Sequence, residues 1–317
     1  MTGHVSAQGV VFVYGALRSG TTVFRLMLDA HPQIANPGEK DFLFDFLHPD
    51  ATHPTGWRYD LDALRLNRIF QASSLQIPPG LTGLDLLDSF LNELRARDTG
   101  RALSINLHRH VDRVLAIMPD VRLLHMLRDP RDVARSSIAM GWAGSLYYGV
   151  GHWIETETDW DKALATPHRA SVMALRYEDL FEDTEARLRE VCDFFDVPFD
   201  PAMLRYHETS TYDAPDPTLI AQWRRKSKPA DVALLESRAG DLMQARGYPP
   251  EMPHTRPDVL TRIRLFVANK RYLWTFGMRR FGVLTYWGEK LSRRLRLTGL
   301  HRRLRQRMNH VVTQGLK

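Results

Sequence analysis

The hydrophobic pattern near the start of the chain predicts a strand, a loop and a helix in succession. Residues 9–15 (GVVFVYG) form a β-branched and aromatic run that ends in glycine, which is typical of a buried strand. Helical spacing begins at Thr22, with apolar residues at Val23, Leu26, Met27 and Ala30. We expect His31-Pro32 to end this helix, because proline cannot continue it.

A second unit of the same kind is predicted around residue 128. Residues 121–127 (VRLLHML) are an apolar run with one histidine, and Asp129-Pro130 then starts a helix with proline at its favoured first position. Arg128 would end the strand, and Ser136 would lie in the helix. In an open parallel sheet, ligands bind at the carboxyl ends of strands, so the two side chains can converge on one anion. The competing interpretation is a structural salt-bridge cluster that joins Arg128 to Asp129 and Arg131.

The first loop has the spacing of a phosphate-binding loop. Gly15 and Gly20 are separated by four residues, and the following helix would point its free N–H groups and positive dipole end into the loop. Nucleotide triphosphatases continue with lysine and then Ser or Thr. Here Thr21 and Thr22 follow Gly20, and Arg18 lies inside the loop. The alternative is a tight turn, capped by a side chain of the loop, that binds nothing.

Length and composition fit one α/β domain, or one domain with an extension. The chain has 317 residues, of which 44% are hydrophobic. Its first ten residues lack a basic stretch followed by an apolar core, and no apolar run approaches the roughly eighteen residues of a membrane span. A single cysteine, Cys192, forms neither an internal disulfide nor a cysteine metal site. We therefore expect a reduced, cytoplasmic setting.

Basic charge is concentrated at the C-terminus. Residues 256–317 hold 16 of the 43 Lys and Arg residues and 2 of the 37 Asp and Glu residues, a balance of +14. Residues 1–255 are left with 27 basic and 35 acidic residues, a balance of −8. Four prolines between Pro249 and Pro257 are typical of a linker. We expect a domain over residues 1–255 and a basic helical extension over residues 256–317.

Three stretches together resemble the sulfotransferases that use 3′-phosphoadenosine 5′-phosphosulfate (PAPS). GALRSGTT resembles their 5′-phosphosulfate loop, RDPRDVARS resembles their 3′-phosphate motif, and residues 174–198 (ALRYEDLFEDTEARLREVCDFFDVP) resemble a later strand–helix segment. The resemblance spans residues 9 to 230 and is closest to the tyrosylprotein and carbohydrate branch. It implies an α/β fold of the P-loop NTPase type, in which helices flank a central parallel sheet. It also implies transfer of a sulfonate from PAPS to a hydroxyl, release of 3′,5′-ADP and no required metal.

The resemblance also implies which residues hold the donor. The 5′-phosphosulfate would lie against Arg18, Ser19, Gly20, Thr21 and Thr22, and the 3′-phosphate against Arg128 and Ser136. Tyr177 matches a tyrosine that approaches the adenine, and Lys226 in QWRRKSKP matches a late basic segment that returns to the nucleotide. Core packing of Tyr177 and a solvated Lys226 are equally good alternatives. No lysine is needed in the loop, since PAPS has one 5′ phosphate and Arg18 can stabilise charge on the bridging oxygen.

A base must take the proton of the acceptor hydroxyl. In the resembled branch a glutamate after the first helix does this, and Glu39 in NPGEKDFLFDF is the candidate. Partial shielding by Phe42 and Phe44 would raise the pKa of Glu39 toward the range of a general base. The alternatives are a structural pairing of Glu39 with Lys40 or Arg18, and a catalytic His108.

The chain departs from the family at one position. Many relatives carry Lys-Thr-Pro on the strand before the second unit, with the lysine facing the sulfonate. The corresponding stretch here, RALSINLHRH, has no lysine, and Arg101, His108 and Lys40 remain candidates to replace it.

Two other classes of protein compete with the sulfotransferase. A small-molecule or nucleotide kinase of the P-loop class would need the loop lysine and an acidic Mg²⁺ site. A nucleic-acid-binding protein would use the basic extension, which matches no groove-reading module. The acceptor stays open among carbohydrates, lipid-linked glycans, natural products and tyrosine.

The extension mixes apolar and basic residues. From residue 291 onward, Leu297, Leu300, Leu304, Met308 and Val311 recur at helical spacing among seven arginines. Upstream, six aromatic residues alternate with basic ones; they are Tyr272, Trp274, Phe276, Phe281, Tyr286 and Trp287. This pattern suits a peripheral helix at an anionic membrane, on its inner face. The alternative is a helix that packs on the acidic domain or across a homodimer.

Overall fold

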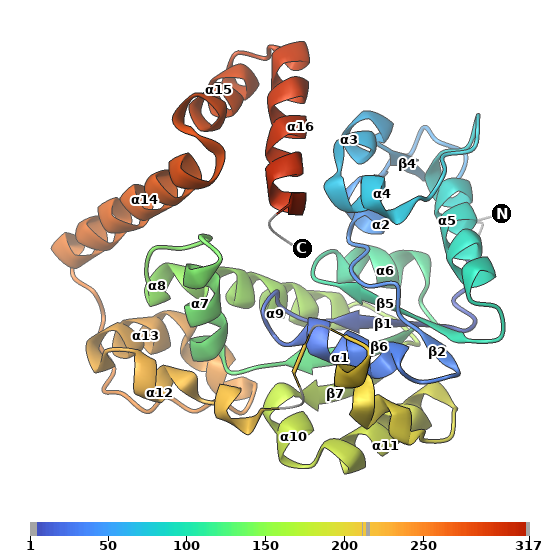
Figure 1. Cartoon of the computed structure of the whole chain (residues 1–317), viewed down its shortest axis with the longest axis horizontal. Coiled ribbons are helices and arrows are strands. Elements are labelled where there is room, and N and C mark those ends of the chain that lie inside the picture. Colours follow the sequence, from blue (N-terminus) through green and yellow to red (C-terminus); the bar gives the residue numbers. More distant parts are fainter. Residues whose placement is uncertain (1–4, 211, 214–215, 315–317) are drawn as a thin grey trace.

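The centre of the molecule is a sheet of five parallel strands, in the order β2-β5-β1-β6-β7 (Figure 1). The structure is a computed structural model, and it describes residues 5–210, 212–213 and 216–314. The strands are β1 (Val10–Tyr14), β2 (Ile34–Ala35), β5 (Ala102–Leu107), β6 (Arg122–Leu127) and β7 (Ser171–Arg176). The predicted α/β fold with a central parallel sheet is therefore confirmed.

Alternating side chains of the strands build two apolar layers. Val10, Phe12 and Tyr14 pack on one face of the sheet, whereas Val11 and Val13 pack on the other. The first layer includes α2 (Phe42–Asp45), the hairpin β3 (Leu47–Pro49) and β4 (Trp57–Tyr59), α3 (Leu61–Leu66), α4 (Arg68–Ser73), α5 (Gly83–Arg97) and α6 (Val111–Ile117). The second includes α1 (Thr21–Asp29), α10 (Tyr177–Glu182), α11 (Thr184–Phe195) and the 3-10 helix η1 (Pro201–Glu208).

A third apolar cluster forms around Trp153 and Trp223. Its helices are α7 (Pro130–Ala139), α8 (Leu146–Gly149), α9 (Gly151–Leu164), α12 (Gln222–Lys226) and α13 (Pro229–Ala245). A short 3-10 helix, η2 (Pro217–Leu219), precedes α12.

The predicted strand–loop–helix units are both present. The first runs from β1 through the loop to α1, and the second runs from β6 to α7 with Pro130 in the first turn. Asp129 caps α7, because its carboxylate accepts a hydrogen bond from the backbone N–H of Arg131. Since β1 lies between β5 and β6, the segments that follow these three strands meet at one edge of the sheet.

The C-terminal extension consists of three helices, α14 (Val259–Phe281), α15 (Val283–Arg294) and α16 (Thr298–Gln314). The helical pattern predicted from residue 291 is therefore interrupted, and Arg296 in the break has a positive φ of 56°. The extension (orange to red in Figure 1) leaves α13, turns at α15 and returns with α16 beside α3. Within the described residues, no helix is both long and apolar enough to cross a membrane.

A buried ionic cluster fixes α7 against the helices that follow. The guanidinium of Arg131 lies 2.8 Å from carboxylate oxygens of Asp129 and of Glu236, and it stacks on the Trp223 ring at 4.0 Å. The side chains of Arg131 and Glu236 are each 3% exposed. Both carboxylates are largely removed from water, and the charge of Arg131 offsets the cost of burying their negative charges.

Replacing Arg131 tests this contribution. We expect Arg131→Ala to lower the free energy of unfolding by about 3–5 kcal/mol, because it leaves two buried carboxylates without a counter-ion. Urea denaturation followed by circular dichroism measures the change. The control is Lys162→Ala, which removes an exposed pair with Asp159 and should cost about 0.5 kcal/mol or less. Equal losses in the two variants would contradict the structural role of the cluster.

Candidate active site

The loop between β1 and α1 depends on two close backbone approaches. A Cβ on Gly15 would lie 2.4 Å from the carbonyl oxygen of Met126 on β6. A Cβ on Gly20 would lie 2.1 Å from the ring of Tyr177, and Gly20 has a φ of 89°. Glycine fits this position because it has no Cβ to meet the Tyr177 ring and because it adopts a positive φ without strain. These contacts bring the loop against the ends of β6 and β7.

The N-terminus of α1 opens into this loop. No side chain caps the helix, so its first N–H groups and its positive dipole end face outward from the loop backbone. The hydroxyl of Ser19 is fully buried beside it and has no hydrogen-bond partner among the described residues. Thr21 is buried, and its carbonyl accepts a hydrogen bond from Asn106 at 3.2 Å. Thr22, the next residue, is half-buried in the first turn. A helix N-terminus with free N–H groups and a nearby buried hydroxyl can bind an anion.

Arg128 follows β6 and reaches across to the loop. Its guanidinium stacks on the Tyr177 ring at 4.0 Å and donates to the carbonyls of Arg18 at 3.1 Å and of Leu219 at 3.2 Å. Its Nε is buried and lacks a partner in the described part of the chain. Arg128 therefore stands outside the Asp129–Arg131 cluster, and the competing salt-bridge interpretation applies to Arg131 alone.

Arg18 joins the two predicted phosphate sites. Its Nε donates to the hydroxyl of Ser136 on α7 at 2.9 Å, so its side chain points to the same side as Arg128. Burial, and then the neighbouring Arg128, lower the pKa of Arg18, as expected for two cations that share one site. The structure thus places Arg18 beside Arg128 and Ser136. The stabilisation of charge on the bridging oxygen by Arg18 stays a prediction.

Glu39 and His108 form the other half of the site. Glu39 bridges to Asn106 beside the end of β5, and its carboxylate lies 3.5 Å from Nε2 of His108. That separation is an ion-pair contact with hydrogen-bond geometry too poor to satisfy Nε2. The buried ring of His108 is held from its other side, because Nδ1 lies 2.7 Å from the carbonyl oxygen of Gly15. The backbone N–H of His108 donates to Asp41 at 2.7 Å.

The expected upward shift in the pKa of Glu39 is wrong. Interaction with His108 lowers the pKa of Glu39 and outweighs the opposing effect of burial. The rings of Phe42 and Phe44, which were expected to shield the carboxylate, are buried in the core. Conversely, Glu39 and Asp41 raise the pKa of His108 against the effect of its burial. Both groups are therefore charged between the usual pKa values of 4.5 and 6.5, and Glu39 pairs with His108 rather than with Lys40 or Arg18.

The candidates for the missing lysine occupy different places. Arg101 lies just before β5, at the opposite end of that strand from His108, where it donates to carbonyls of Asp29 and His31. It is therefore wrong as a sulfonate ligand. Lys40 donates to the carbonyls of Pro37 and Glu39, and burial lowers its pKa to about 8. His108 is the candidate that the loop contacts directly.

Lys226 lies apart from these contacts. Its ammonium donates to the side-chain oxygen of Gln222, one turn earlier on α12, at 3.0 Å. Arg135 of α7 donates to the same oxygen at 2.9 Å, which links α12 to the helix that carries Ser136. Contact of Lys226 with a nucleotide stays a prediction.

Two residues of the site were not found from the sequence. Asn106 donates to Thr21 and accepts from Asn36 at 3.1 Å, so it connects α1 to β5. An isolated asparagine in an apolar strand, two residues before His108, was the available signal. His152 lies 3.0 Å from the carbonyl oxygen of Leu17 and packs edge-on against Trp142. Neither its spacing nor its neighbours in the sequence indicate this contact.

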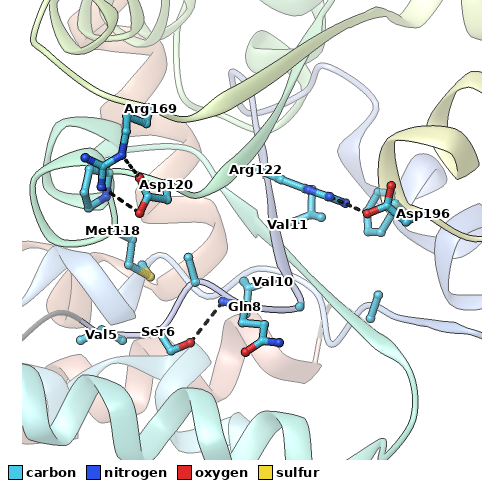
Figure 2. Close-up of a pocket in the computed structure, with 15 residues that line it drawn as sticks. Val5, Ser6, Gln8, Val10, Val11, Met118, Asp120, Arg122, Arg169 and Asp196 are labelled. Atoms are coloured by element: carbon cyan, nitrogen blue, oxygen red, sulfur yellow. Dashed lines mark hydrogen bonds and ion pairs between the residues drawn. The ribbon is translucent and has the colours of Figure 1, made fainter.

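A cavity of about 650 Å³ lies elsewhere, at the amino ends of β1 and β6. Figure 2 shows its cations already paired, Arg122 with Asp196 and Arg169 with Asp120. The predicted site residues instead follow the carboxyl ends of the strands. Cavity volume alone therefore does not locate the candidate active site.

The Glu39–His108 pair predicts a pH-dependent stability. Glu39 contributes above its usual pKa of 4.5, and the contribution is lost as pH falls through its lowered folded value. His108 contributes below its usual pKa of 6.5, and the contribution is lost as pH rises through its raised folded value. Glu39→Gln should therefore destabilise the protein most between pH 4.5 and 6.5, by about 1 kcal/mol because exposure of Glu39 screens the pair.

Urea unfolding across this pH range measures the difference between the wild type and Glu39→Gln. Asp62→Asn, at an exposed carboxylate, is the control and should give a flat difference. A difference for Glu39→Gln that is constant with pH, or that grows in alkali, would show that the pair is not ionic.

Comparison with known proteins points to one family of enzymes. The sequence profile of the sulfotransferase family matches residues 10–201. A putative protein-tyrosine sulfotransferase of Caenorhabditis briggsae is 25% identical over 215 residues, which cover 63% of this chain and 70% of that protein. Protein-tyrosine sulfotransferase A of Caenorhabditis elegans is 23% identical over 221 residues, or 65% of this chain and 54% of that protein.

The fold is also similar to solved structures. The sulfotransferase domain of the Synechococcus PCC 7002 olefin synthase superposes with a TM-score of 0.54 and 19% identity, over 76% of this chain and 94% of that domain. At this identity the likeness concerns the fold alone. The family profile, however, spans more than half of the sequence, and the chain therefore belongs to the sulfotransferase family.

Proposed function

We propose that this enzyme transfers the sulfonate group of PAPS to a hydroxyl acceptor and releases 3′,5′-ADP. The observation that carries the proposal is a pair of buried donors that have no partner among the residues the structure describes. Ser19 Oγ lies beside the N-terminus of α1, and Arg128 Nε lies on the other side of the loop. A buried donor without a partner costs about 1–3 kcal/mol, which a bound anion would offset.

The two donors match the two charged ends of PAPS. The N-terminus of α1 suits the 5′-phosphosulfate, since N–H groups and hydroxyls can hold it without the lysine and Mg²⁺ of a triphosphate site. Arg128 suits the 3′-phosphate, because a guanidinium binds phosphate oxygens in a bidentate manner. Ser136 and Arg18, which already contact each other, stand beside it. The Tyr177 ring lies between the two positions, but it is 3% exposed and the Arg128 guanidinium covers it, so its contact with the adenine stays a prediction.

Transfer then requires a proton acceptor on the acceptor's side of the loop. The new bond forms between the acceptor oxygen and sulfur, and the bond between sulfur and the bridging oxygen breaks, which leaves the negative charge on 3′,5′-ADP. Glu39 takes the proton of the hydroxyl, with His108 fixing the position of its carboxylate. The buried imidazolium also places a positive charge near the loop, through its contact with Gly15.

The charge state of Glu39 affects which kind of acceptor hydroxyl it can deprotonate. A carboxylate with a lowered pKa is ionised at neutral pH but is a weak base. It is better matched to a phenol, with a pKa of about 10, than to the much less acidic hydroxyl of a sugar. The curated relatives are named protein-tyrosine sulfotransferases, which points in the same direction. A tyrosine-type phenol is therefore the first acceptor to test.

Nucleotide selectivity tests the role of Arg128. The wild type should bind 3′,5′-ADP more tightly than 5′-AMP, and Arg128→Ala should remove about 1.5–3 kcal/mol of that preference, since a charge-assisted contact is lost. Isothermal titration calorimetry measures both affinities. Arg122→Ala, at the other end of the same strand and paired with Asp196, is the matched control and should retain the preference. Equal affinity of the wild type for the two nucleotides would refute the assignment.

Turnover tests the role of Glu39. Glu39→Gln keeps the shape and removes the base, so kcat should fall by about 10²–10⁴ while the affinity for 3′,5′-ADP is retained. Asp45→Asn, whose carboxylate pairs with Arg109, is the control and should keep near-normal turnover. If Glu39→Gln stays active and His108→Gln does not, the histidine is the base.

A further inference from the structure

Helix α15 exposes its apolar face and buries its polar one. Its outward positions carry large apolar residues, namely Val283, Leu284, Trp287 and Leu291, and Leu295 follows at the C-cap; they are 40–89% exposed. Its buried residues are Thr285, Glu289 and Ser292, all polar. A helix that packs on a soluble domain has the opposite arrangement. The apolar face of α15 therefore lacks the contact for which its pattern is suited.

Helix α14 also has one face that packs on the protein and one apolar face that is exposed. One face holds it to α7 and the segment that follows: Tyr272 donates to the carbonyl of Ile138 in α7 at 2.8 Å, and Asn269 accepts from the N–H of Gly144 at 2.7 Å. The opposite face presents Ile263, Val267 and Trp274, which are 54%, 57% and 44% exposed. These three recur at intervals of four and seven residues, so they form one stripe.

The two apolar faces meet at a pair of tryptophans. The rings of Trp274 and Trp287 contact each other with their centroids 5.5 Å apart, and Trp287 donates to the sulfur of Met278 at 3.3 Å. We call the joined surface the outer stripe; it comprises Ile263, Val267, Trp274, Val283, Leu284, Trp287, Leu291 and Leu295. Trp residues of this kind are typical of the boundary between lipid and water.

The outer stripe matches the predicted apolar surface only in part: Trp274 and Trp287 belong to it, whereas the five aliphatic residues predicted from 297 onward do not. Of the residues expected to form it, Leu304, Met308 and Val311 are half-buried, and Met308 lines a recess between α16 and α4 with Ile69. Leu297 and Leu300 are about half exposed, at 48% each. The apolar surface left without a partner therefore belongs mainly to α14 and α15.

The charges around the outer stripe are almost all positive. Residues 259–314 contain 14 Lys and Arg residues and one acidic residue, Glu289. Within the described chain, the only ion pair involving these helices is the one between His301 and Glu289, inside the extension. None of the 14 cations pairs with a described carboxylate of the acidic domain, so packing on that domain does not account for them.

We propose that the outer stripe docks on an anionic membrane surface. Exposed apolar side chains would enter the interface while the surrounding Lys and Arg side chains attract anionic headgroups, each worth about 1 kcal/mol near the surface. A second copy of this chain suits the surface less well, because apposing two such faces would bring like charges together. Asn269 and Tyr272 attach α14 to α7 and the segment that follows, so docking would also orient the catalytic domain on the membrane.

Vesicle co-sedimentation of the full chain tests the proposal. The wild type should bind phosphatidylcholine vesicles that contain phosphatidylglycerol much better than pure phosphatidylcholine, and raising NaCl from about 0.05 to 0.3 M should weaken the binding. Leu284→Gln combined with Leu291→Gln should reduce the partition coefficient by about tenfold or more, because two exposed side chains lose their apolar contact with lipid. Arg293→Gln combined with Arg294→Gln should cause a loss of roughly tenfold as well.

Matched controls separate these effects from changes in folding. Val172→Gln replaces an exposed apolar side chain on β7, and Arg187→Gln with Arg189→Gln replaces two exposed cations on α11; both should bind vesicles as the wild type does. Circular dichroism should show all variants folded. The readout is binding alone, so it does not depend on sulfonate transfer.

Four results would overturn the proposal. They are absence of binding to anionic vesicles, equal binding to neutral ones, binding that the double leucine variant retains, and a dimer in sedimentation velocity that this variant dissociates. The last would show that a second copy covers the outer stripe.

Discussion

The position of one guanidinium, that of Arg128, holds the candidate active site together. It stacks on the ring of Tyr177 after β7 and donates to the carbonyls of Arg18 in the first loop and of Leu219 before α12. Gly20 fits under the same ring because it has no side chain. The segments after three strands are thus fixed relative to one another before any ligand binds, which is the preorganisation that anion stabilisation requires.

The pattern of the sequence was sufficient to predict the elements that carry the loop. The apolar run before Gly15, the helical spacing after Thr22 and the Asp129-Pro130 helix start all arise from local preferences, which the structure retains. The extension was harder to predict, because the face that each helix exposes depends on its partners. Its apolar residues predicted helices correctly, but only tertiary contacts show that α15 turns Leu284 outward and Thr285 inward.

The positions of site residues could be predicted where a motif assigns one chemical role to one residue type. Properties that depend on contacts between residues far apart in the chain could not. Arg128 and Ser19 lie at the loop as the motifs indicated, with buried donors that lack a partner in the described chain. The pKa of Glu39 was predicted in the wrong direction, because its shift comes from His108, which is 69 residues away in the chain. A separation of 85 residues likewise hid the contact of Asn106 with Thr21. The Glu39–His108 pair exists because β2 and the segment after it lie beside β5, and the Asn106–Thr21 contact exists because β1 lies on the other side of β5.

The central claim is that this fold moves a sulfonate rather than a phosphoryl group. The most direct measurement supplies isotopically labelled PAPS, or labelled ATP with Mg²⁺, to the same panel of phenolic, sugar and lipid-linked hydroxyls, with the products identified by mass spectrometry. We predict a labelled sulfonate ester and an equal amount of 3′,5′-ADP with PAPS, and no transfer with ATP. Phosphorylated acceptor from ATP, without a sulfonated product from PAPS, would contradict the account.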